Sequence, residues 1–326
     1  MNVILSGDFH QFPPVVGGAH AALYYPTASN DAHRSNTGRE IYEQFRTVII
    51  LKEQVRVKDA VWTAFLRRLR HAIINESNLN MLQSLVLTSE NCVVPNFMQD
   101  PWNSTCLVTP RHVVHEAWND AALQDHCCFN GSQLFICPAL NSIRGRPLSN
   151  IEWLALAVQK SKRETLKSYL PLAIGMRVLV TLNILTDVDL ANGARGTIVG
   201  IGLHPDEVAT LNATVHLQHC PVYVLVKMDH TRAAALPGLE DGVIPITPAS
   251  KSFQISYSVQ NSSGQLQKQQ KTVTRRQFPI TGAYALTDYR SQGQTLKTVI
   301  VDLAKPPSGG ELSLFNIYVA LSRSSG

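Results

Sequence analysis

A stretch of short β-type runs between residues 172 and 280 most constrains how this chain of 326 residues can fold. The runs often alternate apolar with polar positions and cover residues 177–182, 196–201, 213–217, 222–228 and 253–259. The pair Asn192-Gly193 among them is a strong signal for a hairpin-type turn. Short strands at this spacing form a small barrel or sandwich rather than a parallel sheet. The polar segment 261–270 is expected to be the loop-like tip of a long hairpin.

The segments on either side of this stretch have a different predicted pattern of secondary structure, in which strands alternate with helices. Residues 58–73 place apolar side chains four positions apart with arginines on other faces, which predicts an amphipathic helix with a basic side. Further strands are predicted at 105–109 and 298–303, and further helices at 112–124 and 151–159. Val3–Leu5 is interpreted as the end of a buried parallel strand. We therefore expect an α/β domain that contains a β-rich insertion.

Composition excludes several classes of protein. With 44% hydrophobic and 16% charged residues, a mostly disordered or coiled-coil chain is not expected. No apolar run approaches the roughly 18 residues that cross a bilayer, and no secretory signal is seen. Six cysteines without a C-x-x-C pattern fit a reducing intracellular compartment, with buried thiols as the default. The formal charge of +5 permits a polyanion partner, and the four tryptophans are interpreted as core residues.

Four short segments carry the candidate chemistry. The first, SGDFHQFPPV at 6–15, follows the predicted strand and presents Asp8 and Gln11 at a sheet edge where ligands sit in open α/β folds. An amide such as Gln11 can donate to a phosphate oxygen while it accepts from an attacking water. The other segments are LKEQVR at 51–56, ALTDYRSQGQTL at 285–296 and YVALSRS at 318–324.

In this order, the four segments resemble motifs III to VI of the Pif-type DNA helicases, the RecD-like branch of superfamily one. The resemblance covers nearly the whole chain and implies two RecA-like domains, of the P-loop NTPase type, that clamp ATP and move 5′ to 3′ along single-stranded DNA. It assigns residues 1–50 to the tail of the first RecA-like domain. It assigns 51–171 and 281–326 to the second motor domain with its parallel sheet, and 172–280 to an inserted SH3-like β-barrel.

The resemblance also implies roles for individual residues. Arg56 and Arg323 would be the two arginines that reach the γ-phosphate, and Gln11 would sense it. The guanidinium group suits this task because its planar fork makes paired hydrogen bonds and keeps its proton. Further nucleotide-site residues would be Gly7, Asp8, Gly293 and Gln294. The DNA-contacting residues would be Thr109, Asn119, Tyr289, Arg290, Ser291, Gln292 and Thr295.

Ordinary structural roles are the alternatives to these assignments. Each arginine could instead make a surface salt bridge, and Ser291 could cap a helix.

The chain also departs from the common family pattern at four positions. Tyr289-Arg290 replaces His-Lys, Pro110 replaces an asparagine, and Val57 stands where relatives often carry glutamine.

Half of the implied nucleotide site has no counterpart in this sequence. ATP and Mg²⁺ are implied by the family, but the chain contains no Gly-Lys dipeptide and no acidic pair before Gly7-Asp8. A truncated gene model or a decayed copy of a longer helicase is therefore expected. No metal site is expected either, because the His112/His115 and Cys127/Cys128 group and the His216, His219 and Cys220 group lack the paired spacing of zinc modules.

The leading hypothesis is a C-terminal fragment of an ATP-dependent 5′-to-3′ DNA helicase that is inactive alone. Its expected partners are single-stranded DNA and an upstream helicase half, with no membrane. The alternatives are a non-catalytic nucleic-acid-binding module and a decayed, non-functional remnant. An intracellular location is expected, in the nucleus rather than the mitochondrion.

Overall fold

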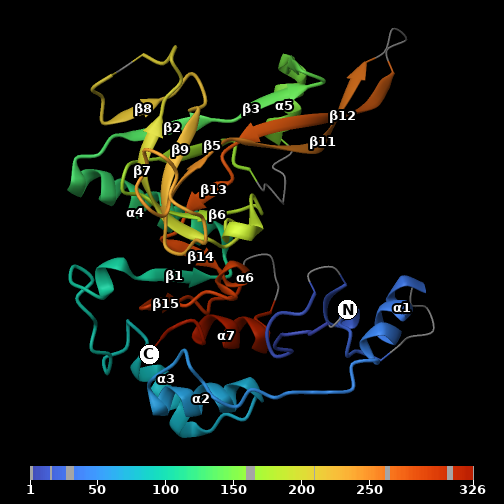
Figure 1. The fold of residues 1–326 in the computed structure, drawn as a ribbon, viewed down its shortest axis with the longest axis vertical. Coiled ribbons are helices and arrows are strands. Elements are labelled where there is room, and N and C mark those ends of the chain that lie inside the picture. Colours follow the sequence, from blue (N-terminus) through green and yellow to red (C-terminus); the bar gives the residue numbers. More distant parts are fainter. Residues whose placement is uncertain are drawn as a thin grey trace. The chain divides into compact units, whose positions relative to one another are not determined.

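The fold was obtained as a computed structural model, which describes residues 3–14, 17–26, 33–158, 166–208, 210–260, 265–306 and 311–325 (Figure 1). The chain divides into two compact units. The first contains Met1–His115 and Ala285–Gly326, and the second contains Glu116–Tyr284. The β-rich stretch 172–280 lies within the second unit, which also takes in α5 (Asn150–Val158) and most of α4 (His112–Asn130).

The first unit contains a small parallel sheet. Its strands lie in the order β14 (Ala285–Thr287), β1 (Cys106–Thr109) and β15 (Val299–Val301), and both pairings are parallel. All four residues of β1 are buried, as expected for a central strand in a parallel sheet. The predicted α/β fold with a parallel sheet is therefore confirmed for this unit.

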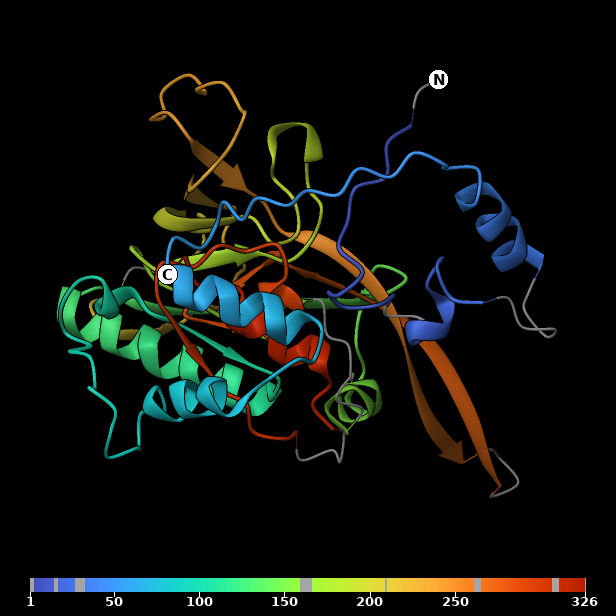
Figure 2. The ribbon, with the colours of Figure 1, turned by 90° about the horizontal axis from the view of Figure 1, so that it is seen from below.

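Helix α2 (Ala60–Arg70) forms the core of the first unit together with α7 (Leu314–Leu321), and the two helices lie side by side in Figure 2. Phe65, Leu66 and Leu69 of α2 are buried against Tyr318 and Leu321 of α7. The helix begins where the Asp59 carboxylate accepts a hydrogen bond from the Trp62 amide at 2.6 Å. Arginines at its last turn face the negative end of the helix dipole. The amphipathic helix predicted at 58–73 is thus confirmed, with slightly shorter bounds.

The remaining elements of this unit are short. They are the 3₁₀ turns η1 (Gly18–Ala21) and η2 (Trp102–Ser104) and the helices α1 (His33–Tyr42), α3 (Glu76–Ser84) and α6 (Asp288–Ser291).

The second unit is built mainly from antiparallel sheets. The five-stranded sheet has the order β10 (Val243–Ile246), β9 (Tyr223–Met228), β7 (Arg195–Gly202), β6 (Arg177–Val180) and β13 (Ile280–Gly282). A second sheet joins β5 (Tyr169–Leu172), β2 (Leu134–Pro138) and β8 (Thr214–His216). The third joins β11 (Ala249–Gln260), β12 (Leu266–Gln277), β3 (Leu140–Ile143) and β4 (Arg146–Pro147). A 3₁₀ turn, η3 (Thr186–Val188), lies between β6 and β7. The five predicted strands of this stretch all appear.

The long hairpin β11–β12 is visible as a twisted ribbon in Figures 1 and 2 and is paired over twelve positions from Ala249–Gln277 to Gln260–Leu266. The loop predicted at 261–270 is therefore too long, because pairing already includes Leu266. The four residues 261–264 lie outside the described part of the chain. Ile255 of β11 and Val273 of β12 are buried in one cluster with Ala155 and Leu156 of α5.

Two sequence predictions about burial are wrong. Val3–Leu5 is not a strand, and Ile4 is 90% exposed, because no described segment supplies a neighbouring strand. Trp118 and Trp153 are exposed rather than in the core. Trp118 lies on α4 away from the face that buries Asn119 and Leu123, since adjacent helical residues point about 100° apart.

Within the described residues, no helix is both long and apolar enough to cross a membrane.

Candidate functional site

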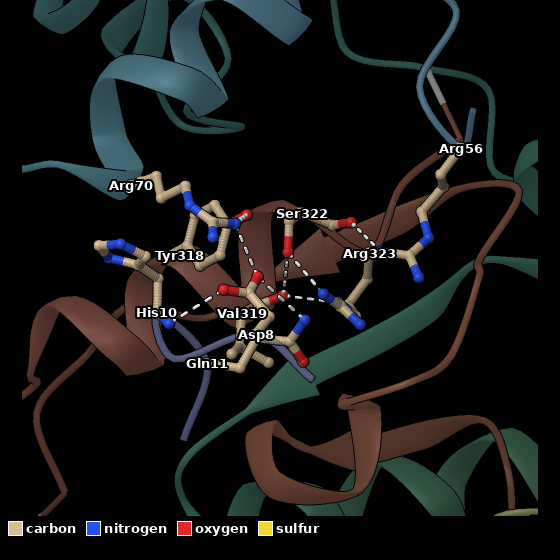
Figure 3. Close-up of polar contacts among 9 residues, drawn as sticks. All are labelled: Asp8, His10, Gln11, Arg56, Arg70, Tyr318, Val319, Ser322 and Arg323. Atoms are coloured by element: carbon tan, nitrogen blue, oxygen red, sulfur yellow. Dashed lines mark hydrogen bonds and ion pairs between the residues drawn. The ribbon is translucent and has the colours of Figure 1, made fainter. Parts of the chain in front are cut away.

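The turn that follows Gly7 is organised by the Asp8 carboxylate (Figure 3). Asp8 accepts hydrogen bonds from the His10 amide at 3.0 Å and from the Gln11 side-chain amide at 3.3 Å. It also forms an ion pair with Arg70 of α2, with an N–O distance of 2.7 Å. Arg70 in turn donates to the Tyr318 hydroxyl of α7 at 3.3 Å. The segment that carries Gln11 is therefore fastened to both core helices of the first unit.

Arg56 connects three of the segments that the sequence singled out. Its side chain leaves the extended chain before α2, and its Nε donates to the Thr295 hydroxyl at 3.1 Å. One terminal nitrogen donates to the Ser322 carbonyl at 3.2 Å. These two bonds join residues that lie more than 230 positions apart in the chain.

Arg323 is almost fully buried, with 1% of its surface exposed. Its Nε donates to the Val319 carbonyl at 2.8 Å, and one terminal nitrogen donates to the Ser322 hydroxyl at 2.7 Å. The other terminal nitrogen is buried and has no hydrogen-bond partner in the described part of the chain. Burial and, to a smaller extent, the nearby positive charge of Arg56 lower the pKa of Arg323 to about 10.

The two guanidinium groups are therefore close enough to repel each other, and one of them keeps a buried donor without an acceptor. Asp8 also lies within electrostatic reach of Arg323, and Gln11 is hydrogen-bonded to Asp8. Figure 3 shows Gln11, Asp8 and the two arginines gathered in one region. A cluster of this kind can hold an anion with several acceptor oxygens, such as a phosphate group.

The glycines expected at the nucleotide lie in the loops that carry these side chains. Gly7 precedes Asp8 and is exposed, and a Cβ atom at this position would meet nothing within 4 Å. Gly293 has a φ of +83°, a conformation that favours glycine, and also faces open space. The Gln294 amide donates to the Ser291 carbonyl at 3.0 Å. The structure therefore leaves both glycines accessible to a ligand.

Residues 288–291 form the short helix α6. The Thr287 hydroxyl caps it by accepting from the Arg290 amide at 3.4 Å. Ser291 is fully buried and donates to the Asp288 carbonyl at 2.7 Å, so its hydroxyl has a structural use, whereas Gln292 is exposed. Burial lowers the pKa of Arg290. Asp288 accepts a short hydrogen bond from Asn316, which ties α6 to α7.

Tyr289 is 53% exposed, and its ring stacks on Phe12 with centroids 4.1 Å apart and planes inclined by 18°. Phe12 follows Gln11, so this contact links the segment of Gln11 to the segment that precedes Ser-Gln-Gly. Neither Phe12 nor Arg70 was among the residues expected at the site. The arginine could have been suspected from its place in the basic side of the predicted helix, whereas nothing in the sequence pairs Phe12 with Tyr289.

Thr109 and Asn119 are both buried and engaged in protein contacts. The Thr109 hydroxyl donates to Asp302 at 2.6 Å and accepts from the Arg111 amide at 3.1 Å. Arg111 also forms an ion pair with Asp302 at 2.8 Å. The Asn119 side-chain oxygen accepts from the Tyr284 amide at 3.0 Å. Each residue therefore holds its own segment in place, the first at the end of β1 and the second on α4.

Among the described residues, no group of three or more His, Cys, Asp and Glu side chains is arranged to hold a metal ion. All six cysteines are free thiols, of which Cys106, Cys137 and Cys220 are buried and Cys128 is exposed.

Comparison with known proteins gives one curated relative and several solved structures. The chain is 27% identical over 323 residues to the ATP-dependent DNA helicase Pif1 of Bdellovibrio bacteriovorus, covering 99% of this chain and 56% of the relative. It thus spans little more than half the length of the curated relative that it matches. No family model matches the sequence.

The solved structures show the same fold. The Pif1 helicase of Candida albicans aligns with a TM-score of 0.57 and 20% identity, covering 98% of this chain and 61% of that chain. The Bacteroides Pif1 helicase in complex with ADP-AlF3 and single-stranded DNA aligns with a TM-score of 0.53 and 18% identity, covering 98% and 58%.

The fold matches that of solved Pif1 helicases, and the sequence is similar to that of a curated ATP-dependent DNA helicase Pif1. The resemblance to the C-terminal portion of a Pif1-type helicase, inferred from the four sequence segments, is therefore confirmed.

Proposed function

We propose that the chain is the C-terminal motor portion of an ATP-dependent 5′-to-3′ DNA helicase. In this proposal Arg56 and Arg323 bind the γ-phosphate of ATP, and Gln11 senses it. Gly7, Asp8, Gly293 and Gln294 shape the surrounding loops. The proposal also takes the first unit to contain the second RecA-like domain and the β-rich stretch to correspond to the SH3-like insertion of the family.

The observation that supports this function most directly is the terminal nitrogen of Arg323 that has no partner among the described residues and lies beside a second guanidinium group. A buried donor without an acceptor is costly, and two neighbouring cations repel. A phosphoryl group with three equatorial oxygens would relieve both costs and would gain charge stabilisation in the transition state of phosphoryl transfer. The cluster therefore suits the γ-phosphate end of a nucleotide.

The chain does not provide the other end of that site. Neither a Gly-Lys dipeptide for the β-phosphate nor an acidic pair for Mg²⁺ is present in the sequence around these motifs. We therefore propose that an upstream helicase half supplies them, and that this chain alone does not hydrolyse ATP. The nucleotide would then be bound only when both halves are combined.

For DNA, we propose that single-stranded DNA runs past the segment 289–295. Tyr289 offers a half-exposed ring on which a base can stack, and Gln292 and Thr295 are exposed polar neighbours. Arg290 and Ser291 would support this surface from within. Thr109 and Asn119 would position their segments, because their side chains already make hydrogen bonds within the protein.

The test combines this chain with the P-loop half of a Pif1-type relative and a labelled thymidine oligonucleotide, followed by fluorescence anisotropy. Adding ADP with aluminium fluoride should change the oligonucleotide affinity at least several-fold. Arg56→Ala and Arg323→Lys should abolish that response, whereas Arg67→Ala, on the exposed side of α2, should leave it intact. Lysine is used at 323 because alanine would leave a cavity in a buried site.

A second candidate function is a non-catalytic nucleic-acid-binding module. It is favoured by the 53% exposed ring of Tyr289 beside the exposed Gln292 and Thr295, because stacking on a base needs no nucleotide site. In the same experiment, DNA binding that is indifferent to nucleotide and to both arginine variants would support the binding module and contradict the motor.

A further inference from the structure

Two cysteines lie in contact in the second unit, far along the chain from the arginine site. Cys137 of β2 and Cys220, between β8 and β9, have sulfur atoms 3.7 Å apart. Cys137 is fully buried, and Cys220 is 8% exposed. The Leu217 amide donates to the Ile136 carbonyl at 3.1 Å, so the loop that carries Cys220 is tied to β2. Strands β2, β8 and β9 are labelled in Figure 1.

The loop around Cys220 is further fixed by Glu207. Its carboxylate accepts hydrogen bonds from the backbone amides of Gln218 at 3.0 Å and His219 at 2.9 Å. Two amide donors and the nearby His219 imidazole lower the pKa of Glu207, against the opposing effect of burial. Cys220 is therefore held on a rigid loop rather than on a freely moving segment.

Cys220 also lines a cavity of about 310 Å³. The cavity is walled in addition by His204, His219, Arg276 and Val222, and the two imidazole rings stack at 4.7 Å with planes 19° apart. Cys137 does not line this cavity among the residues that the structure describes. Cys220 thus lines a space that a small molecule can enter, whereas Cys137 is fully buried.

The hydrogen bonding gives the two thiols different characters. The Cys137 thiol lies within hydrogen-bond distance of the Cys220 sulfur at 3.7 Å and of the Gln277 side-chain oxygen at 3.5 Å. Its bond to the Cys220 sulfur lowers the pKa of Cys220, with a further contribution from Arg276 against the effect of burial. The same bond raises the pKa of Cys137, and burial adds to it. A thiolate is the nucleophilic form of cysteine. Cys220 is therefore the thiol prepared to react, and Cys137 is placed to resolve the product.

We propose that Cys220 and Cys137 form a site of reversible thiol oxidation, in which a small hydroperoxide enters the cavity and reacts at Cys220. The Cys220 thiolate attacks one peroxide oxygen, the O–O bond breaks, and a sulfenic acid forms as hydroxide leaves and takes up a proton. The Cys137 sulfur then attacks the sulfenic sulfur, the S–O bond breaks, and a disulfide forms with release of water. Two thiols lose two electrons in total, and hydrogen peroxide is reduced to two waters.

The test treats the purified chain with graded hydrogen peroxide, blocks the remaining thiols by alkylation and maps the peptides by mass spectrometry. The expected product is an intramolecular Cys137–Cys220 disulfide with a mass loss of about 2 Da, which dithiothreitol reverses. It should form at lower peroxide than any oxidation of Cys92 or Cys128. If Cys128 is oxidised first while Cys137 and Cys220 remain alkylatable, the proposal is wrong.

Single-residue variants test which cysteine reacts with the peroxide and which cysteine then forms the disulfide. Cys137→Ser should leave a sulfenic acid on Cys220 that dimedone traps, whereas Cys220→Ser should leave Cys137 reduced. Arg276→Gln should slow disulfide formation several-fold. Lys268→Gln, an exposed cation on the same face of β12, should not. The wild-type map decides the proposal even if a cysteine variant fails to fold, and dimedone labelling at Cys137 instead of Cys220 would overturn the assigned order.

Discussion

At the scale of single residues, the ion pair between Asp8 and Arg70 fastens the segment that carries Gln11. Both side chains are partly buried, and Asp8 also holds the His10 amide. Replacing Arg70 with glutamine should raise the hydrogen-exchange rate of the His10 and Gln11 amides about fivefold, equivalent to a loss of about 1 kcal/mol. Hydrogen exchange with mass spectrometry on peptides that cover residues 3–14 measures this.

The same substitution has a second readout at His10. Burial lowers the pKa of His10, and the positive charge of Arg70 lowers it further. Arg70→Gln should therefore raise the pKa of His10, which a titration of the imidazole resonances by NMR detects. Arg67→Gln, an exposed position of the same helix, is the matched control. Equal exchange rates in the two variants would show that the Arg70 ion pair does not hold the segment.

Glu152 is the residue at which acid should weaken the second unit. Arg146 binds its carboxylate through two hydrogen bonds, of 2.6 and 2.8 Å, and lowers the pKa of Glu152 to about 2 from an ordinary 4.5. Because the folded-state pKa is depressed, this stabilisation is complete above about pH 4.5 and is lost as pH falls toward about 2. In Glu152→Gln, the urea concentration at which half of the protein is unfolded should fall less steeply as the pH decreases over that interval. Glu116→Gln, at an exposed site on α4, should keep the wild-type profile.

The candidate site could be inferred from the sequence only in part. The family resemblance carried by the four segments singled out Gln11, Arg56 and Arg323, and the structure places them together in one region (Figure 3). Their binding roles remain predictions. The sequence could not show that a terminal nitrogen of Arg323 lacks a partner among the described residues, because that depends on how the side chain is buried. Nor could it show that Phe12 stacks on Tyr289, because these residues lie more than 200 positions apart.

At the scale of elements, α2 is the helix on which the first unit depends most. Leu69 is 1% exposed and packs toward Tyr318 and Leu321 of α7. Leu69→Ala should reduce the free energy of opening α2 and α7 by about 3 kcal/mol, because it removes buried methyl groups and leaves a cavity. Hydrogen exchange of the α2 and α7 amides in the native state measures this energy. Val61→Ala on the same helix, 65% exposed, should cost less than about 0.5 kcal/mol.

The helix was predictable because its evidence is local. The spacing of Phe65 and Leu69 and the cap at Asp59 specify an amphipathic helix without reference to the rest of the chain. The strand predicted at Val3–Leu5 failed for the opposite reason. A strand exists only when a neighbour pairs with it, and apolar character alone does not supply one. The exposed run Val48–Leu51 has the same character and is likewise unpaired among the described residues.

At the scale of the whole molecule, the change from alternating strands and helices to a series of short β-strands was visible in the sequence. Short alternating runs gave the strands of the second unit, and strand–helix alternation gave the parallel sheet of the first. The extent of the second unit was not visible, because it depends on contacts that join β2 and β3 to strands more than 70 residues later. Pairing of β3 with β12, for example, brings residues 140–142 beside residues 274–276.

The net charge of +5 and the proposed DNA surface lead to a prediction about salt. If two to three cations contact phosphates of single-stranded DNA, the affinity should fall about tenfold between 50 and 200 mM salt, since each contact releases condensed counterions. Fluorescence anisotropy with a labelled thymidine oligonucleotide at several salt concentrations gives the slope. Tyr289→Ala should weaken binding about tenfold without changing that slope, because stacking releases no counterions. A slope near zero would exclude phosphate contacts as the basis of binding, and an unchanged affinity in Tyr289→Ala would show that the ring stays on Phe12.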